Sequence, residues 1–270
     1  DKSIMERGFW TFLKENQATS ISGVPYTYEM LLRLRFFRMD LPHLKTMTQA
    51  GGKLSIELQR SYAQYALENN KNFIIMYGQC EATARMAYLP SEYALEKIGS
   101  MGIPIPGGRF ELADSDGNII NKPESSGELI YYGDNVTLGY AENIRDLNLG
   151  DERKGKLETG DIAYRDHDGF YFISGRKKRF LKLYGNRVNL DEVEILLKNE
   201  FADTELAVGG NDDKLIIFIT DSAMIEDEMI EFISTVTGIY KAAFTVKYIE
   251  KIPYNASGKI LYKELEKYFD

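Results

Sequence analysis

The sequence has few of the residues that build disulfide frameworks and metal centres. Cys80 is its single cysteine, so no internal disulfide can form, and a reducing, cytoplasmic compartment fits best. Its two histidines, His43 and His167, lie far apart, which argues against a zinc site made from histidine and cysteine. No histidine lies near Cys80 in the sequence, so we interpret this cysteine as structural rather than nucleophilic.

Long apolar runs and an excess of positive charge are missing as well. The longest apolar candidate, 215–219, has the length of a strand, whereas a membrane-spanning helix needs about 20 apolar residues. No secretory signal pattern is visible at the N-terminus. The net charge of −8 argues against broad nucleic-acid binding, which requires a basic surface. We therefore expect neither a membrane span nor a nucleic-acid partner.

The residues that are present have the balance of a soluble globular protein. Hydrophobic residues make up 44% of the chain and charged residues 27%. A length of 270 residues corresponds to one large domain or two smaller ones. The chain starts at Asp1 rather than at methionine, and a helical pattern begins almost at once. We therefore expect a fragment of a longer polypeptide.

Residues 1–97 alternate between helix and strand patterns. Strands are predicted at 18–21, 44–48 and 72–76, and helices at 26–37 and from Ser55 to about residue 69. Ser55 is a good N-cap, and 73–76 is an uninterrupted apolar run, as in a buried parallel strand. This alternation predicts a sheet that is covered by helices.

The pattern changes after residue 97. Residues 98–177 are rich in glycine and turns, and strands are predicted at 109–113, 128–132, 162–164 and 170–173, which indicates a β-rich subdomain. Residues 178–270 have a compact α+β pattern, in which Asn189 and Glu192 form a capping-box-like helix start. Strands are predicted there at 180–184, 206–208, 215–220 and 244–249, and further helices at 227–236 and from Tyr262. We therefore predict an α/β chain with a domain boundary between 177 and 178.

Four short motifs are weak signals when each is taken alone. Tyr-Gly-Gln-Cys-Glu at 77–81 could be a strand end, and Thr-Gly-Asp at 159–161 is most often a turn. The basic segment that begins with Gly-Arg at 175–176 could be a solvated linker. Residues 253–259, which end in Gly-Lys, could be a surface loop, and they are not a P-loop because the first glycine of G-x-x-x-x-G-K is missing.

Together, and in this order, the four motifs resemble the signature motifs of the adenylate-forming (AMP-binding) ligases, the superfamily of acyl-CoA synthetases and luciferases. Further segments match: Gly-Val-Pro at 23–25, Gly-Gly-Lys-Leu-Ser at 51–55, Gly-Glu-Leu at 127–129 followed by Gly139-Tyr140, and the stretch 175–194. The resemblance covers nearly the whole chain and corresponds to the C-terminal half of a family member. It implies that 1–177 is a truncated adenylation domain and that 178–270 is a small, mobile lid domain.

The resemblance also implies a nucleotide site. Tyr77 would present its ring to adenine, and Glu81 would bind Mg²⁺ together with ATP phosphates. Asp161 would accept hydrogen bonds from the ribose hydroxyls, and Arg176 would contact ribose or phosphate. The expected nucleotide- and thiol-binding residues are Gly51, Gly52, Tyr77, Gly78, Cys80, Asp161, Arg176, Lys182 and Gly185.

Lys259 matches the catalytic lysine of the family. Its ammonium would lie between the substrate carboxylate and the α-phosphate, where it stabilises charge that grows in the transition state. Lys178 stands at the position about which the lid of the family rotates between two steps. After that rotation the loop at Gly185 would line the tunnel for the thiol.

The implied reaction activates a small-molecule carboxylic acid with ATP and then transfers the acyl group to CoA or to a phosphopantetheine thiol, so a separate carrier protein is a possible partner. Two features depart from the family pattern. Cys80 replaces a threonine, and a thiol is the poorer hydrogen-bond donor. The Ser/Thr/Gly-rich phosphate loop is missing, and we expect it upstream of Asp1. A non-catalytic fragment or binding module with the ligase fold remains the alternative, and neither the acid nor the acceptor can be read from the sequence.

Overall fold

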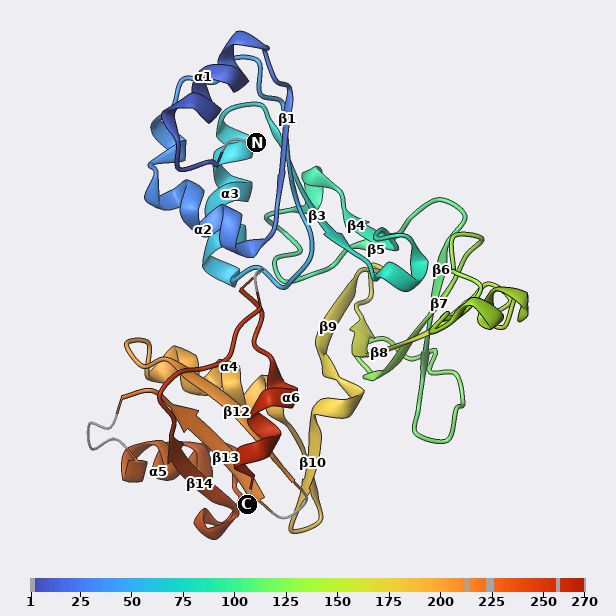
Figure 1. Cartoon of the computed structure of the whole chain (residues 1–270), viewed down its shortest axis with the longest axis vertical. Helices are drawn as coiled ribbons and strands as arrows, with labels where there is room; N and C mark the ends of the chain where they lie inside the picture. Colours follow the sequence, from blue (N-terminus) through green and yellow to red (C-terminus); the bar gives the residue numbers. More distant parts are fainter. Residues whose placement is uncertain (1–2, 212–213, 222–225, 256–257, 270) are drawn as a thin grey trace. The chain divides into compact units, whose positions relative to one another are not determined.

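The computed structural model describes residues 3–211, 214–221, 226–255 and 258–269, without the side chains of Lys178 and Arg187. The chain forms two compact units. Unit 1 contains Asp1–Thr159 and Ala163–Ile173, and unit 2 contains Gly160–Ile162 and Ser174–Asp270 (Figure 1). Each unit has its own core. The boundary at 177/178 stays a prediction from the sequence.

A five-stranded sheet forms the first part of unit 1. Its strands are β1 (Ser20–Gly23), β2 (Thr46–Gln49), β3 (Asn72–Tyr77), β4 (Ala87–Leu89) and β5 (Ile103–Pro104), in this spatial order. The first three strands are parallel, as the buried apolar run at 73–76 predicts, whereas β4 and β5 pair antiparallel. Because β2 and β3 are parallel neighbours, the loops that follow them leave from the same edge of the sheet.

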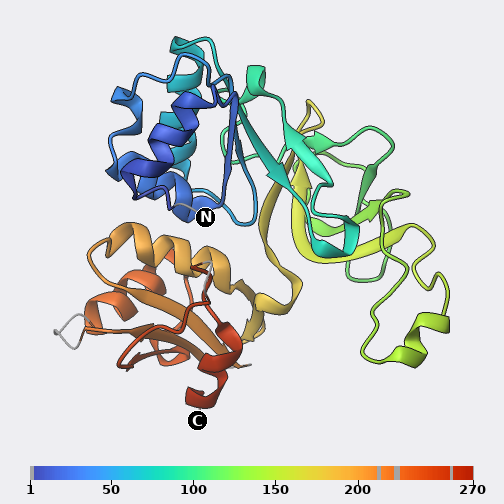
Figure 2. The same cartoon turned by 45° about the horizontal axis from the view of Figure 1, so that its top comes forward.

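Three helices cover this sheet: α1 (Arg7–Glu15), α2 (Pro25–Arg33) and α3 (Ile56–Glu68) (Figure 2, dark blue to cyan). The predicted N-cap of α3 is confirmed, since Ser55 accepts a hydrogen bond from the amide of Leu58. Tyr28, Phe36, Tyr62 and Phe73 are fully buried between the helices and the sheet. Helix α2 ends earlier than predicted, because Arg35 adopts a left-handed backbone conformation (φ 59°) before the short 3₁₀ helix η1 (Phe36–Arg38).

A four-stranded sheet forms the second part of unit 1, as the β-rich pattern predicts. Its strands are β6 (Arg109–Ala113), β7 (Gly127–Tyr132), β8 (Lys156–Arg165) and β9 (Tyr171–Arg176), in spatial order. Leu129 and Tyr131 of β7 pack in one buried cluster with Ala82 and Met86 from the loop after β3. This cluster anchors that loop, which contains η2 (Cys80–Ala82), to the second sheet; η3 (Ser91–Tyr93) and η4 (Ile144–Asn148) complete the unit.

Unit 2 has the α+β architecture that the sequence predicts. Strand β13 (Lys214–Ile219) lies between the antiparallel β12 (Leu206–Asn211) and the parallel β14 (Phe244–Tyr248). Side chains of β13 alternate between two buried faces: Leu215, Ile217 and Ile219 pack with α4 (Leu190–Glu200) and α5 (Glu226–Thr237), and Ile216 and Phe218 pack with Leu265. The C-terminal segment with α6 (Tyr262–Leu265) and η7 (Glu266–Tyr268) therefore covers the second face of the sheet.

A hairpin corrects one local prediction. The strand predicted at 180–184 ends at Leu183, and the turn consists of Tyr184 and Gly185. Both turn residues have positive φ, as a two-residue hairpin loop requires. The chain then returns as β11 (Asn186–Asn189) beside β10 (Phe180–Leu183), and Asn189 caps α4 through the amide of Asp191, as predicted. Short 3₁₀ turns, η5 (Lys177–Arg179) and η6 (Lys241–Ala243), precede β10 and β14. Among the described residues, no helix has the length and apolar character to cross a membrane.

Candidate functional site

The motif Tyr77–Glu81 lies where β3 ends. Tyr77 is the last residue of the strand and is partly buried, with its ring centroid 6.3 Å from that of Phe110. Gly78 passes so close to the next turn that a Cβ there would lie 2.2 Å from the carbonyl oxygen of Ala84. Gln79 donates a hydrogen bond to the carbonyl of Thr159 at 3.0 Å. The glycine is therefore required by backbone crowding, and the segment is tied to β8.

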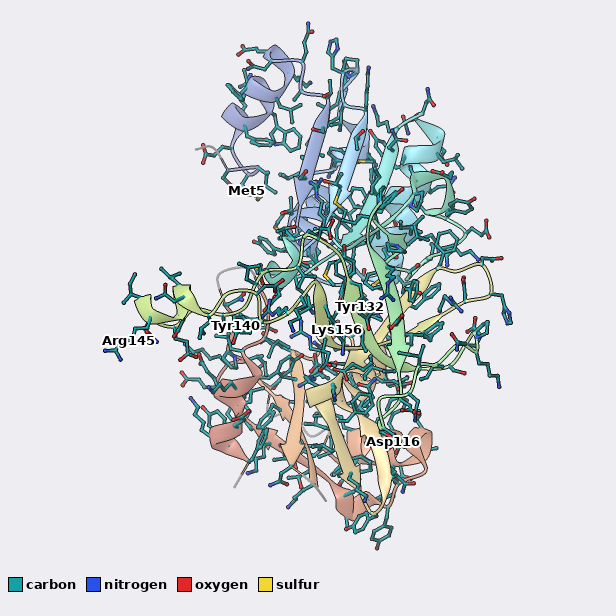
Figure 3. The ribbon with its side chains drawn as sticks, turned by 90° about the vertical axis from the view of Figure 1, so that its right-hand side faces the viewer. Met5, Asp116, Tyr132, Tyr140, Arg145 and Lys156 are labelled. Atoms are coloured by element: carbon teal, nitrogen blue, oxygen red, sulfur yellow. The ribbon has the colours of Figure 1, made fainter. Side chains whose placement is uncertain are left out.

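Glu81 is held as an ionised carboxylate. The hydroxyl of Tyr140 donates to Glu81 Oε1 at 2.6 Å, and the backbone carbonyl of Glu81 accepts from the amide of Thr137 at 2.8 Å. The guanidinium of Arg153 lies over the Tyr140 ring, 4.5 Å from its centroid. The hydrogen bond from Tyr140 lowers the pKa of Glu81, and Arg153 adds to this effect. Figure 3 shows Tyr140 on the segment that leads to Arg145 of η4.

The donor set at Glu81 fits a magnesium ion that shares its coordination with a substrate. Mg²⁺ keeps several waters and is usually held by one or two carboxylates together with phosphates. Tyr140 hydrogen-bonds to Oε1 of the carboxylate. No group of three or more His, Cys, Asp or Glu side chains in the described parts of the chain could hold a metal by itself. Glu81 therefore suits a cation that a phosphate brings with it, and not an all-protein metal cage.

Asn135 holds the loop that carries Glu81. Its Nδ2 donates to the carbonyls of Ala82 (2.8 Å) and Arg85 (3.2 Å), and its Oδ1 accepts from the hydroxyl of the buried Tyr131 (2.8 Å). Between these carbonyls, Thr83 and Ala84 both have left-handed backbone conformations, with φ of 58° and 66°. Such conformations are costly for residues other than glycine and persist where surrounding contacts enforce them. Asn135 supplies such contacts.

Sequence reasoning did not assign roles to Tyr140, Asn135 or Arg153. Tyr140 was matched as part of a family segment, and Asn135 lies inside the same segment, between Gly133 and Val136. A search of that segment for hydrogen-bonding side chains could have found both. Arg153 had no signal in the sequence.

The glycines of the β2–α3 loop lie at the same edge of the first sheet as Tyr77. Gln49, the last residue of β2, is paired in register with Ile75, two residues before Tyr77. The buried side chain of Gln49 donates to the carbonyl of Gly52 at 2.8 Å, and Gly51 has a positive φ of 83°. Carboxyl ends of parallel strands are the usual place for ligands in α/β sheets. Unit 1 thus brings two of the predicted nucleotide segments to one edge.

Asp161 and Arg176, the two predicted ribose contacts, lie together in unit 2. Arg176 Nε is 3.3 Å from Asp161 Oδ1, and the Asp161 side chain is nearly buried while that of Arg176 is exposed. The amide of Arg176 also donates to Asp191 Oδ2 at 3.1 Å. The acidic and basic groups are therefore arranged as a pair, with the arginine on the solvent side.

Lys182 and Gly185 belong to the β10–β11 hairpin. Lys182 is exposed and is in register with Arg187, and Gly185 occupies the turn with a φ of 85° and open space where a Cβ would be. The ligand-binding roles of Lys182 and Gly185 stay predictions from the sequence. The predicted hinge residue Lys178 lies in η5, and its side chain, like that of Arg187, is outside the description.

Lys259 is exposed, and its backbone is hydrogen-bonded to Asn255. Its amide donates to Asn255 Oδ1 at 2.9 Å, and its carbonyl accepts from the amide of Asn255 at 2.9 Å. Tyr254 and Ile260 form an antiparallel bridge next to these bonds. Two residues of this motif, Ala256 and Ser257, lie outside the described residues. The backbone around Lys259 is thus fixed while its side chain is accessible.

The predicted site residues fall into two groups, one for each unit. Unit 1 contains Gly51, Gly52, Tyr77, Gly78, Cys80 and Glu81, and unit 2 contains Asp161, Arg176, Lys182, Gly185 and Lys259. Cys80 is exposed. The binding and catalytic roles of all these residues stay predictions from the sequence.

The chain combines an α/β unit, which has two sheets with helices on the first sheet, with a separate α+β unit. Residues 2–141 match the family model described as AMP-binding enzyme. The chain therefore belongs to the family of AMP-binding enzymes, which confirms the resemblance to adenylate-forming ligases.

Curated relatives are similar over most of this chain. The chain is 30% identical over 240 residues to 4-coumarate–CoA ligase-like 2 of Arabidopsis thaliana, covering 85% of this chain and 42% of the relative. It is 31% identical over 197 residues to 2-succinylbenzoate–CoA ligase of Bacillus mycoides, covering 71% of this chain and 40% of the relative. The chain thus spans less than half the length of these curated relatives.

Solved structures share the fold. The O-succinylbenzoate coenzyme A synthetase (MenE) of Bacillus subtilis, in complex with ATP and magnesium ion, aligns with a TM-score of 0.75 and 22% identity over 96% of this chain and 54% of that chain. The anthranilate CoA ligase AuaEII, in complex with anthranoyl-AMP, aligns with a TM-score of 0.68 and 22% identity over 97% of this chain and 52% of that chain. The predicted fold class, α/β with a helix-covered sheet, a β-rich subdomain and a small C-terminal α+β domain, is confirmed.

Proposed function

We propose that this chain is part of an ATP-dependent ligase that joins a carboxylic acid to a thiol through an acyl-adenylate. The observation that carries the proposal is the ionised Glu81, fixed by Tyr140 in the loop directly after the partly buried Tyr77. Family membership and the CoA ligases among the relatives support the same chemistry. A reducing cytoplasm, as the single cysteine suggests, is the compartment we propose.

In the first step, a carboxylate oxygen attacks the α-phosphorus of ATP, and the bond to pyrophosphate breaks. Tyr77 contributes an aromatic face for adenine, and Asp161 with Arg176 contacts the ribose. Glu81 would hold Mg²⁺, which would supply neutralisation of the phosphate charge. Lys259 contributes an ammonium that stabilises the negative charge on the reacting oxygens. The products are the acyl-adenylate and pyrophosphate.

In the second step, the sulfur of CoA or of a phosphopantetheine thiol attacks the acyl carbonyl. AMP leaves with the bonding electrons, and the thiol proton goes to solvent or a base. Lys178 is the proposed hinge position for a rotation of the lid between the steps, and Gly185 with Lys182 would border the path of the thiol. The acceptor is either free CoA or a carrier protein. Adding each of them to the preformed acyl-adenylate, and measuring which one receives the acyl group, identifies it.

The test is acid-dependent ATP–pyrophosphate exchange by the complete polypeptide. The first acids to offer are 4-coumarate, ferulate and 2-succinylbenzoate, which the names of the relatives suggest. We expect exchange with at least one acid, and a loss of about 10²–10³-fold in Lys259→Ala. The matched control is Lys263→Ala, an exposed lysine four residues further along, which should retain exchange. Full exchange in Lys259→Ala would refute the role of this lysine.

A non-catalytic binding module is the second candidate, because the chain spans less than half the length of its curated relatives. Calorimetry with a non-hydrolysable acyl-AMP analogue distinguishes the two. Binding without exchange, by the complete polypeptide and across a broad panel of acids, favours the module. Binding together with exchange favours the ligase.

A further inference from the structure

The segment that carries Lys259 is anchored by Tyr262, three residues further along the chain. The Tyr262 hydroxyl lies 3.0 Å from both carboxylate oxygens of Glu194 in α4. Burial, together with the neighbouring Glu194, raises the pKa of Tyr262, so the hydroxyl keeps its proton and is the donor. Tyr262 begins α6, whose Leu265 is fully buried against the central sheet of unit 2.

Glu194 is a buried hub with four partners. The Glu194 side chain is 8% exposed, and among its partners the side chain of Arg179 is nearly buried whereas that of Lys198 is 42% exposed. Besides Tyr262, it accepts from the amide of Val208 at 3.0 Å and from Lys198 at 2.6 Å, and Arg179 Nη2 lies 3.2 Å from its Oε2. A buried carboxylate with this many donors has a fixed position. If it moved, it would lose donors, and its negative charge would be left without compensation.

Arg179 closes the cluster from the other side. It is also buried: its Nε lies 2.6 Å from Asp191 Oδ1, and its Nη1 donates to the carbonyl of Val208 at 2.9 Å. Its guanidinium carbon stands 3.5 Å from the centroid of the Tyr262 ring. The Tyr262 side chain is therefore held at both its polar and its apolar part, by Glu194 at the hydroxyl and by Arg179 at the ring face.

The two ends of the Lys259 loop are bound to each other, and Tyr254 at the first end also hydrogen-bonds to Glu205. The amide of Leu261 donates to the carbonyl of Pro253 at 2.8 Å, next to the bridge between Tyr254 and Ile260. These bonds join the described residues on the two sides of the motif. The direction in which the loop leaves the sheet depends on where its ends are attached, and Tyr262 is the first residue after the loop with polar bonds into the interior.

We propose that Tyr262, held by Glu194 and Arg179, is the positioning residue for Lys259. This inference rests on the proposed role of Lys259 in the formation of the acyl-adenylate. Tyr262 does not itself contact a reacting atom; it fixes the segment from which the ammonium extends. Misplacement of a catalytic group by about 1 Å can lower a rate by about 100-fold, so a single hydroxyl at this position can control the first step.

The test compares the two half-reactions in the variant Tyr262→Phe, which keeps the ring beneath Arg179 and removes only the hydroxyl. We expect kcat for ATP–pyrophosphate exchange to fall roughly 10- to 100-fold while KM for the acid and for ATP changes little. Thiol transfer from supplied acyl-adenylate should be unchanged. The matched control is Tyr268→Phe, the same chemical change on an exposed ring of the same segment, which should leave both half-reactions unchanged. Equal losses in both half-reactions would show a general folding defect and would overturn the positioning role.

A second measurement separates this inference from the proposed function. Amide hydrogen exchange reports the loop directly, through the amides of Lys259 and Leu261. We expect both amides to exchange faster in Tyr262→Phe, with the amides of β12 and β13 unchanged. Unchanged protection of Lys259 and Leu261 overturns the positioning role, whether or not the wild-type protein is active. Absence of ATP–pyrophosphate exchange in the wild type, with every acid offered, refutes the proposed function instead.

A double variant tests whether Tyr262 acts through Lys259. If it does, Tyr262→Phe should cause no further loss of exchange activity when Lys259 is already alanine, because the two changes remove the same contribution. A further roughly 10-fold loss in the Lys259→Ala background would mean that Tyr262 acts by another route, and the proposal would be wrong.

Discussion

The two charged groups that the proposed reaction needs, Glu81 in unit 1 and Lys259 in unit 2, are supported in opposite ways. Glu81 is held by Tyr140, which is 68% exposed. The Lys259 loop is attached through Glu194 and Arg179, which are 6% and 9% exposed. One support is a hydrogen bond at the surface, and the other is a buried ionic cluster.

The two supports therefore have different effects. The contact at Glu81 changes the pKa of a carboxylate, and the contacts at Glu194 fix the position of a segment. Water and salt screen a surface contact, so it adds little to the free energy of unfolding but can still shift a pKa. Ions buried as a cluster are screened much less, and removal of one partner leaves charge without compensation. We therefore expect loss of the Tyr140–Glu81 hydrogen bond to alter ionisation with little effect on stability, and loss of the Glu194 carboxylate to alter stability strongly.

The largest expected effect is that of Glu194→Ala. This change removes the carboxylate shared by Arg179, Lys198 and Tyr262, and we expect it to lower the free energy of unfolding by about 3–5 kcal/mol. The measurement is urea denaturation followed in unit 2, for example by the amides of β12 and β13. The control Glu192→Ala, an exposed glutamate on the same helix, should cost less than about 1 kcal/mol. Similar losses in the two variants would contradict the assignment of Glu194 as the centre of a buried cluster.

Two glycines extend the comparison from side chains to the backbone. Gly78→Ala should cost about 2–3 kcal/mol, because its Cβ would meet the backbone of Ala84 and the loop has to move. Gly185→Ala should cost about 1 kcal/mol, since the turn has space but φ is positive. Thermal and urea unfolding measure both. A larger loss at Gly185 than at Gly78 would mean that the loop after β3 is not as crowded as the structure has it.

Asn135 gives an effect of intermediate size. Asn135→Ala leaves the carbonyls of Ala82 and Arg85 and the hydroxyl of Tyr131 without their partner, and we expect a loss of about 1–2 kcal/mol. Asn135→Asp is the sharper variant, because it keeps the acceptor for Tyr131 and removes the donor to the loop. If the donor is what holds the loop, both variants should displace Glu81. ATP–pyrophosphate exchange should then need a higher Mg²⁺ concentration to reach half of its maximum. A wild-type Mg²⁺ dependence in Asn135→Asp would contradict this.

Local patterns in the sequence predicted the elements that are long enough to have a period. The apolar run at 73–76 predicted β3, and Ser55 and Asn189 predicted the starts of two helices, because an apolar strand and an N-cap are properties of neighbouring residues. Strands β4 and β5 were missed, since with three and two residues they are too short to show alternation. The order of four motifs predicted the family, although no single motif did.

Contacts between distant residues could not be predicted in the same way. Tyr140 and Glu81 are 59 positions apart, and Tyr262 and Glu194 are 68 positions apart. Each pair exists because the fold brings two segments together, and neither the spacing nor the residue types indicate a partner. The resemblance named Glu81 and Lys259, whereas the residues that set the charge of one and the attachment of the other became visible only in three dimensions.

The smallest change in stability, and the most specific change in ionisation, is expected for Tyr140→Phe. The hydrogen bond from Tyr140 lowers the pKa of Glu81 in the folded state. A carboxyl group with a lowered folded pKa contributes stability above its unfolded pKa, which is about 4.3 for glutamate, and this contribution is lost as the pH falls through the folded value. Without the hydroxyl, the pKa of Glu81 should rise toward its ordinary value.

Two measurements check this prediction. At neutral pH, Tyr140→Phe should lower the free energy of unfolding by less than about 1 kcal/mol, and the difference from wild type should vanish in acid, where Glu81 is protonated in both proteins. NMR titration of the Glu81 carboxyl should show the rise in pKa directly. The control is Tyr248→Phe, an exposed tyrosine of unit 2, which should leave the Glu81 titration unchanged. An unaltered pKa in Tyr140→Phe would mean that the surface hydrogen bond does not set the ionisation of Glu81. The comparison with the buried cluster at Glu194 would then be wrong for Glu81.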